Sequence, residues 1–296
     1  MLDSYAENPY HISQPAITRV PFVFNSPHSG RFYAPEFLAA SRLDHATIRK
    51  SEDFYVDELF ETVVPLGAPL LKANFPRAWL DVNREPYELD PAMFDGPLPN
   101  FTNTRSIRVS GGLGTIAKIV AEGEFIYNNK LQPEEGLNRI ETLYKPYHAA
   151  LRQLLAKSVN RFGHAVLIDC HSMPSHNTRL IRSNSQRVDF VIGDRYGTSC
   201  SQELTHAAAD FLRDLGYSVS INKPYAGGFI TEHYGRPENQ LHAIQIEINR
   251  AIYMDEVHFK HSSNFVNLQS DLATFTSRLV SIPEYIFNDG SSLAAE

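Results

Sequence analysis

The sequence predicts an α/β fold, a three-layer arrangement in which a mixed, mostly parallel sheet is flanked by helices. One observation is the continuous apolar run at 164–171, which is typical of a central strand buried on both faces. Another is the run at 242–249, in which three isoleucines alternate with polar residues as in a strand. Predicted strands and helices also alternate along the chain, which favours a sheet covered by helices.

The individual elements follow from local patterns. Runs of β-branched, aromatic or apolar residues bounded by turn residues predict strands at 20–25, 68–74, 77–82 (after a turn at Pro76), 164–171, 189–194, 217–222 and 242–249. Apolar residues at helical spacing predict helices at about 44–64, 134–159, 200–215 and 264–281. The clearest helix is 134–159, because Glu134 and Glu135 lie at its start, where the helix dipole favours acids. Residues 84–117 show no period and predict a long loop, which is usually functional or disordered.

The domain organisation is predicted to be simple. Residues 1–19 are polar and rich in turn residues, so we expect an arm laid over the surface. The sequence contains no internal repeat, and no linker divides the remainder. We therefore expect residues 20–296 to form a single catalytic domain.

Composition excludes several classes of protein. The 296 residues are 43% hydrophobic and 21% charged, which is the profile of a folded globular chain. A net charge of −7 repels phosphate backbones, so no nucleic-acid partner is expected. Cys170 and Cys200 cannot form a disulfide framework, and without a CxxC pair a thiolate metal site is not expected. Because the sequence shows neither a signal peptide nor a long apolar run, we expect a soluble, cytoplasmic protein without membrane contact.

Two histidines follow apolar strands at the sheet edge where ligand sites form. A single histidine is more often a surface or core residue, but His28 and His171 would point into the same crevice. Neutral imidazoles are common metal ligands, and catalytic zinc takes three protein ligands and a water. A carboxylate is then needed as the third ligand. Spacing alone does not choose among the nearby acids, which are Glu52, Asp53, Asp57 and Glu58.

Three further polar residues are candidates for chemistry. Glu247 alternates with Ile246 and Ile248, so its side chain points away from theirs, toward solvent or a cleft. Beside a zinc-activated water it would serve as general base and then as general acid. Asn83 and Arg84 end a predicted strand, and the guanidinium of Arg84 suits a carboxylate gripped at two points. Taken alone, these residues would be a surface acid and a surface ion pair.

Other motifs carry no prediction of a site. Gly111, Gly112 and Gly114 do not follow a strand and do not complete a nucleotide-binding motif. Ser172 lacks the GxSxG sequence that would support a serine nucleophile. Cys170 faces away from Asp169 and His171 on the strand, which indicates a core thiol.

The chain contains the motifs SPHSG, SEDF, DVNRE, GLGTIAKIVAEGEFIY, IDCHSMPS, PYAGGFITEHYG and IQIEINRAIYMDE. Taken together, these motifs resemble those of the N-formylglutamate amidohydrolases. The resemblance runs from about Val20 to Glu256, most of the chain, with the motifs in the expected order. The full set of motifs is specific for this family, although PHSG or DCHS alone would be weak evidence of membership. The family in turn resembles zinc carboxypeptidases and aspartoacylase-type deacylases in fold.

The resemblance implies roles for residues at matching positions. It makes His28 and His171 zinc ligands, with Asp53 completing the set and Glu52 as its rival. Zinc is the implied ion, although another divalent metal would suit the same ligands. The compact His-x-x-Glu of the carboxypeptidases is absent, because Arg31 stands three residues after His28.

The resemblance also implies a substrate and a reaction. Glu247 matches the catalytic glutamate, while Asn83 and Arg84 match the pair that holds a substrate carboxylate. The implied reaction is hydrolysis of N-formyl-L-glutamate to formate and L-glutamate, a closing step of histidine breakdown. The alternatives are a deacylase of another N-acyl or N-formimino amino acid, and a non-catalytic metal- or carboxylate-binding protein on the same fold. A dicarboxylate also requires a second arginine, with Arg77, Arg105, Arg108 and Arg182 as unranked candidates.

Overall fold

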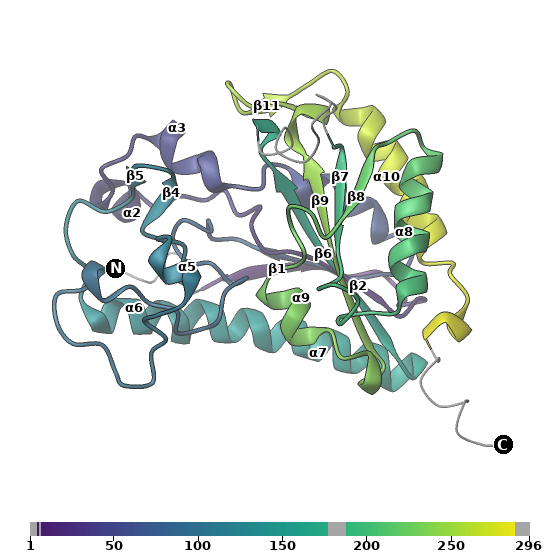
Figure 1. The fold of residues 1–296 in the computed structure, drawn as a ribbon, viewed down its shortest axis with the longest axis horizontal. Helices are drawn as coiled ribbons and strands as arrows, with labels where there is room; N and C mark the ends of the chain where they lie inside the picture. Colours follow the sequence, from purple (N-terminus) through teal and green to yellow (C-terminus); the bar gives the residue numbers. More distant parts are fainter. Residues whose placement is uncertain (1–4, 6, 177–187, 288–296) are drawn as a thin grey trace. The chain divides into compact units, whose positions relative to one another are not determined.

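Seven strands form the main sheet of the computed structural model, which describes Tyr5, residues 7–176 and residues 188–287. Strands β2, β6 and β9 pair in parallel, β7 is antiparallel to β9, and β8 is parallel to β7 (Figure 1). This confirms the predicted mixed, mostly parallel sheet. In sheet order the strands are β1 (Tyr10–Ser13), β3 (Leu70–Ala73), β2 (Phe22–Ser26), β6 (Ala165–Met173), β9 (Leu241–Asn249), β7 (Phe190–Gly193) and β8 (Val219–Ile221).

The chain divides into two compact units. The smaller comprises Met1–His11, Pro27–Glu52 and Lys72–Arg152, and the larger comprises Ile12–Ser26, Asp53–Leu71 and Gln153–Glu296. The predicted arm and single domain stay a prediction, although β1 lies within the segment that we expected to be an arm. None of the described helices combines the length and apolar character needed to cross a membrane.

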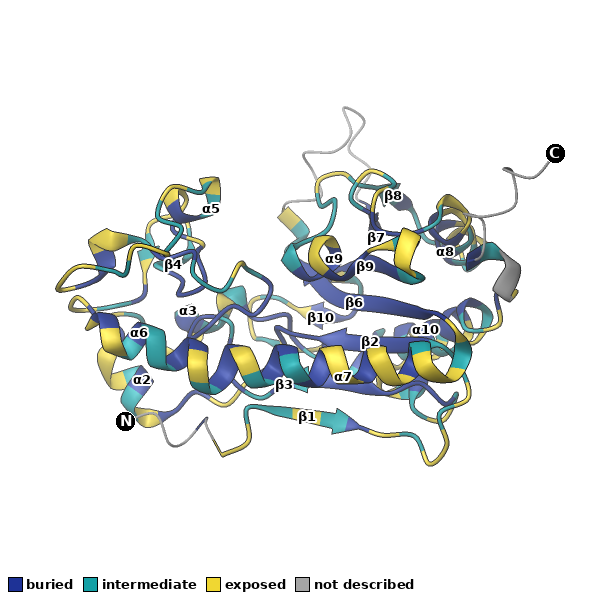
Figure 2. Cartoon of the chain, turned by 90° about the horizontal axis from the view of Figure 1, so that it is seen from below, coloured by how far each residue is buried: buried dark blue, intermediate teal, exposed yellow. Residues whose placement is uncertain are grey.

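Helices of the larger unit lie on both faces of its strands. One face packs against α4 (Val56–Leu59), α8 (Gln202–Asp214) and α10 (Phe265–Leu279). The opposite face carries α9 (Phe229–Tyr234) and the C-terminal part of α7 (Lys145–Phe162) (Figures 1 and 2). These helices confirm the layered arrangement that the sequence predicts.

The apolar core lies on the α8 and α10 side. There Phe24 of β2, Cys170 of β6 and Ile246 of β9 belong to one cluster of fully buried side chains. Cys170 is a buried thiol in this core, as predicted, and Cys200 is also free and buried. The opposite face of the same strands is buried as well, and it carries polar side chains toward the carboxyl ends of the strands. It carries Asn25, Asp169, His171, Gln245 and Glu247.

The smaller unit contains short elements and one long helical stretch. Its helical segment α6 (Pro133–Arg139) continues through the π turn η4 (Ile140–Tyr144) into α7, which confirms the clearest predicted helix. Arg139 is fully buried, and its guanidinium lies 3.2 Å from the ring centre of Trp79. The other elements are α2 (Pro35–Ala40), α3 (His45–Ile48), η1 (Arg49–Ser51), η3 (Pro91–Met93), α5 (Ile107–Ser110), β4 (Ile119–Ala121) and β5 (Glu124–Phe125).

The larger unit holds further short elements. A two-stranded sheet pairs Met254 with His261 and Asp255 with Lys260 in antiparallel register. These elements are η2 (Glu61–Val63), η6 (Pro237–Asn239), η7 (Arg250–Ile252), β10 (Met254–Asp255), β11 (Lys260–His261) and η8 (Glu284–Phe287).

Two predicted elements are wrong in detail. The helix expected at 44–64 begins as predicted, with Asp44 capping the Thr47 amide, but it breaks between η1 and α4. Tyr55 there has a φ of 61°, a left-handed conformation that interrupts a helix. The segment expected to be a strand at 77–82 is instead a turn. The backbone amide of Trp79 donates back to the carbonyl of Pro76, and the backbone amide of Asp81 donates to the carbonyl of Thr115 instead of to a neighbouring strand.

Candidate active site

Strand register brings the polar residues of β6 and β9 to one face. His171 is the register partner of Glu247, and Asp169 is the partner of Gln245. Register partners in a parallel pair project to the same side, so both pairs lie opposite the isoleucines of β9. His28 follows the neighbouring strand β2, two residues after its end at Ser26. The carboxyl ends of three parallel strands therefore supply the candidate residues.

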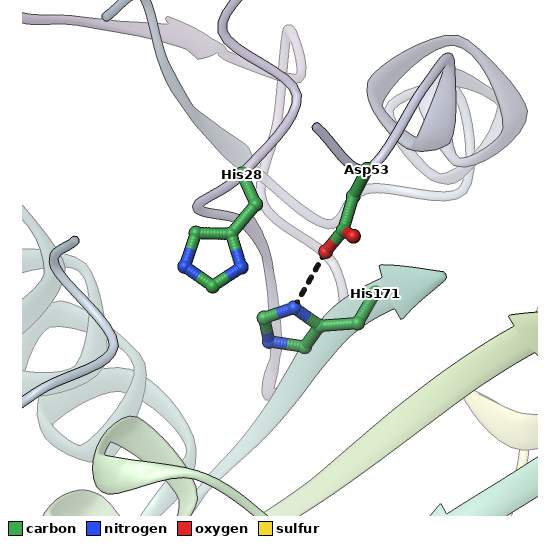
Figure 3. A group of neighbouring side chains, drawn as sticks. All are labelled: His28, Asp53 and His171. Atoms are coloured by element: carbon green, nitrogen blue, oxygen red, sulfur yellow. Dashed lines mark hydrogen bonds and ion pairs between the residues drawn. The ribbon is translucent and has the colours of Figure 1, made fainter. Parts of the chain in front are cut away.

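His28, Asp53 and His171 form a group that could hold a metal ion (Figure 3). Each offers one ligand atom, and these atoms all lie within 4.8 Å of one another. All three residues are buried, and Asp53 Oδ2 lies 2.9 Å from His171 Nδ1. Two imidazoles and one carboxylate are a donor set that zinc accepts in catalytic sites.

The break in the predicted helix separates Asp53 from its rival. Glu52 directly follows η1, and its carboxylate binds the guanidinium of Arg49 at 2.9 and 3.0 Å. Burial raises the pKa of Glu52 despite that arginine. Asp53 instead lies within the break and points to His171. Of the other acids considered, Glu58 contacts His261 at 3.5 Å.

Each histidine also contacts a buried carboxylate outside the metal-binding group. His28 Nε2 lies 2.7 Å from Asp81 Oδ1, and His171 Nε2 lies 2.9 Å from Asp169 Oδ2. Such carboxylates orient metal-binding imidazoles, because a ring that donates from Nε2 has its lone pair on Nδ1. Asp169 is held in turn by the amide of Asn25 at 2.7 Å. Strand β2 therefore supports the histidine of β6.

The charges and the burial around this site shift the pKa values of His171 and Asp81. Burial alone would lower the pKa of His171, but Asp169 and Asp53 outweigh it and raise that pKa well above its usual value. Burial alone would raise the pKa of Asp81, but Arg77, Arg84 and His28 hold it well below its usual range. Because metal ligands bind without their protons, an ion at His171 would displace one.

Glu247 is nearly buried and is oriented by a neighbour in the same strand. Only 7% of its surface is exposed, and Gln245 Nε2 donates to its Oε1 at 2.8 Å. The side-chain oxygen of the same glutamine, Gln245 Oε1, accepts from the backbone amide of Gly228 at 2.7 Å, at the start of α9. Ile246 and Ile248 pack into the core on the other face, as strand alternation predicts.

Asn83 and Arg84 lie together in the smaller unit, next to Asp81. Arg84 donates to the carbonyls of Leu113 at 2.9 Å and Asn83 at 2.8 Å, and its Nη2 lies 3.7 Å from Asp81 Oδ2. Asn83 is buried, and its backbone amide donates to Asp81 Oδ1 at 2.8 Å. Asp81 thus contacts the ring of His28 and also Asn83 and Arg84, the pair predicted to hold a substrate carboxylate and called the carboxylate clamp below.

The candidates for a second substrate arginine have different surroundings. Arg77 binds Asp81 at 2.7 Å, and Arg108 lies 3.7 Å from Glu88. Arg105 is exposed, and Arg182 lies outside the described residues. Arg77 is therefore the candidate that shares a carboxylate with Arg84.

Two residues without a predicted catalytic or binding role, Ser172 and Gly114, have structural roles in this region. Ser172 Oγ accepts from Arg250 at 3.1 Å and lies 3.5 Å from Asp53 Oδ1, so it serves this network. Gly114 packs so closely that a Cβ would lie 2.2 Å from the Glu88 carbonyl oxygen, which explains the glycine without a phosphate. The sequence did not predict a role for Arg250, because its position directly after β9 does not indicate its distant partner Asp53.

Comparison with known proteins gives a consistent result. The family model described as N-formylglutamate amidohydrolase matches residues 20–254. The N-formylglutamate deformylase of Pseudomonas aeruginosa is 31% identical over 80% of this chain and 84% of its own length. The N-formylglutamate deformylase of Pseudomonas putida is 29% identical over 80% of this chain and 83% of its own length.

A solved structure is similar over nearly the whole chain. The crystal structure of N-formylglutamate amidohydrolase from Ralstonia eutropha JMP134 superposes with a TM-score of 0.87 at 36% identity. The match covers 95% of this chain and 99% of that one. The resemblance carried by the sequence motifs is therefore confirmed in sequence and in fold.

Proposed function

This chain belongs to the N-formylglutamate amidohydrolase family, and from that membership we propose that it hydrolyses N-formyl-L-glutamate to formate and L-glutamate. The observation that carries the proposal is the convergence of His28, Asp53 and His171, with Glu247 beside His171 in the strand register. Relatives named as deformylases support the choice of substrate. The two products would close the breakdown of histidine, in the cytoplasm.

The donor set fits zinc, held by His28, Asp53 and His171. When bound, zinc lowers the pKa of a coordinated water to about 7 and polarises a carbonyl oxygen. Asp81 and Asp169 keep the two imidazoles oriented for this task.

Glu247 moves the proton of the reaction. It accepts a proton from water as the water oxygen adds to the formyl carbon. It then gives that proton to the amine nitrogen as the C–N bond breaks, because an unprotonated amine is a poor leaving group. Gln245 donates to one oxygen of Glu247 and so holds the carboxylate in a fixed orientation.

Asn83 and Arg84 bind a carboxylate of the substrate, and Arg77 is the second cation beside them. A protein of net charge −7 needs such a local positive group to attract a dicarboxylate. Arg84 and Arg77 are already fixed by Asp81, so little side-chain entropy is lost on binding.

The experiment that tests the proposed function combines metal analysis with hydrolysis assays. Purified protein is analysed for zinc and other divalent metals and is then assayed on formyl-, formimino-, acetyl- and succinyl-glutamate. We expect one metal per chain and the highest kcat/KM with the formyl compound. Preference for another compound would assign a different deacylase, and metal without turnover would assign a binding protein.

The carboxylate clamp has its own test, the change Arg84→Lys. Lysine keeps the charge but loses the planar fork, and one charge-assisted hydrogen bond contributes about 1.5–3 kcal/mol. We therefore expect kcat/KM to fall about 10- to 100-fold, mainly through KM. The matched control is Arg152→Lys on the exposed side of α7, which should leave both constants unchanged. Unchanged kinetics in Arg84→Lys would remove Arg84 from the site.

A further inference from the structure

Arg250 is a buried cation that the proposed reaction does not use. It begins η7, directly after β9, and only 5% of its surface is exposed. Its side chain contacts two segments far away in the sequence. The Nε atom donates to Ser172 Oγ on β6, and Nη2 donates to Asp53 Oδ1, both at 3.1 Å. The guanidinium carbon also lies 5.7 Å from the ring centre of Phe54.

The two oxygens of Asp53 therefore have different partners. Oδ1 accepts from Arg250, and Ser172 Oγ lies 3.5 Å from it. Oδ2 lies 2.9 Å from His171 Nδ1, on the side of the metal-binding group. Rotation about the last side-chain bond of an aspartate is soft and nearly two-fold, so it does not itself choose between the oxygens.

The backbone around Asp53 does not impose the orientation either. Asp53 lies in the break between η1 and α4, where the chain is outside regular structure and Tyr55 is left-handed. Arg250 donates to Asp53 from Nη2 and to Ser172 from Nε, so the planar guanidinium is itself fixed in direction and restricts the carboxylate more than a freely rotating point charge would. Ser172 anchors that fork to β6, the strand that carries His171.

From this geometry we propose that Arg250 is a positioning residue that reserves Oδ1 of Asp53, so that Asp53 offers Oδ2 alone to a divalent metal held with His28 and His171. A ligand that gives one oxygen leaves a coordination position for water and substrate, as a catalytic site needs. The inference rests on the metal site of the proposed function. It concerns a residue that touches neither substrate nor metal.

The sign of the effect on metal affinity distinguishes positioning from simple charge. If Arg250 acted only as a nearby positive charge, its removal would strengthen the binding of a cation. If it positions Asp53, its removal weakens metal binding, by the 10- to 100-fold typical of residues that orient metal ligands. Arg250→Lys keeps the charge and loses the fork, so only the positioning role predicts weaker binding in that variant.

The experiment measures metal binding directly in Arg250→Lys, Arg250→Met and the control Arg213→Met, an exposed arginine that pairs with Asp210. Zinc affinity is measured by competition with a chromogenic chelator, and the visible spectrum of the cobalt-substituted proteins reports coordination. We expect both Arg250 variants to bind zinc about 10- to 100-fold more weakly and to show a weaker cobalt spectrum, as coordination number rises. If Arg250→Met does not fold, Arg250→Lys alone decides.

Two results would overturn the inference and separate it from the proposed function. Unchanged or tighter zinc binding in both variants, with an unaltered cobalt spectrum, would overturn the role of Arg250 while the wild type still binds metal and hydrolyses substrate. A wild-type chain that binds no divalent metal would overturn the proposed function and this inference together.

Discussion

The two faces of strands β6 and β9 are buried to similar degrees but differ in chemistry toward the carboxyl ends of the strands. Ile246 is fully buried in the apolar core, while its neighbour Glu247 is 7% exposed on the face of His171. On β6, Cys170 and His171 divide in the same way. Burial therefore does not distinguish the stabilising face from the candidate catalytic face.

What distinguishes the faces is how their buried groups are satisfied. The core face gains stability from apolar area removed from water. The polar face would lose stability if its groups were unpaired, and each is matched by another polar group. Asp169 has Asn25 and His171 as partners, and Glu247 has Gln245. A change on one face should therefore affect folding, and a change on the other should affect chemistry.

The largest expected effect is on the polar face, from Glu247→Gln. Glutamine keeps the volume and can still accept the hydrogen bond of Gln245, but it cannot take a proton from water. General acid–base catalysis contributes about 10²–10⁴-fold, so we expect kcat to fall by at least that factor. Metal content and thermal stability should stay close to those of the wild type.

The control for that variant is Glu203→Gln, an exposed acid in the first turn of α8. Turnover and metal content are measured side by side in both variants. Near-normal turnover in Glu247→Gln would remove the general base from the proposal. Loss of metal in the same variant would place Glu247 among groups that hold the site together.

The next effect is on the core face, from Ile246→Ala. Truncating a buried isoleucine costs about 2–5 kcal/mol of unfolding free energy, because it leaves a cavity in a packed cluster. Specific activity of the folded fraction should remain near normal. Denaturant unfolding and initial rates at low temperature measure the two quantities. Ile246→Val should cost about 0.5–1.5 kcal/mol, and a large loss of activity without loss of stability would contradict the division between the faces.

The sequence predicted the division between these faces because strand alternation is a local property. The apolar run of β6 and the isoleucines of β9 placed Glu247 opposite Ile246 and Ile248 before any fold was known. The choice of Asp53 over Glu52 could not be made from spacing, because it depends on the break at Tyr55.

Long-range partners were the main source of error. The segment 77–82 looked like a strand, but Asp81 bonds to His28, which lies 53 residues away. Arg250 looked unremarkable after a strand end, and its partner Asp53 is 197 residues away. Neither pairing leaves a local pattern, so only the folded chain reveals it.

The smallest effect comes from His242, a polar residue on the core side of β9. It is 3% exposed, its Nδ1 accepts from the Ser201 amide at 3.2 Å, and its ring centre lies 5.2 Å from that of Phe287. Burial and the neighbouring His164 lower the pKa of His242 to about 4. In the unfolded chain the same ring has a pKa of about 6.5.

Acid should therefore destabilise the fold through this ring. Between pH 6.5 and pH 4 the unfolded chain binds a proton at His242 and the folded chain does not, so stability is complete above about pH 6.5 and falls as pH falls toward 4. At pH 5 the unfolding free energy is lower by about 2 kcal/mol for this reason.

His242→Asn keeps an acceptor for Ser201 but cannot be protonated, so the unfolding free energy of this variant should fall by about 2 kcal/mol less than that of the wild type between pH 7 and pH 5. Urea unfolding at both pH values measures this, with the exposed His206→Asn as control, which should show the full wild-type drop. Equal drops in all three proteins would mean that His242 is protonated in the folded chain, and that the core face of β9 tolerates a charge.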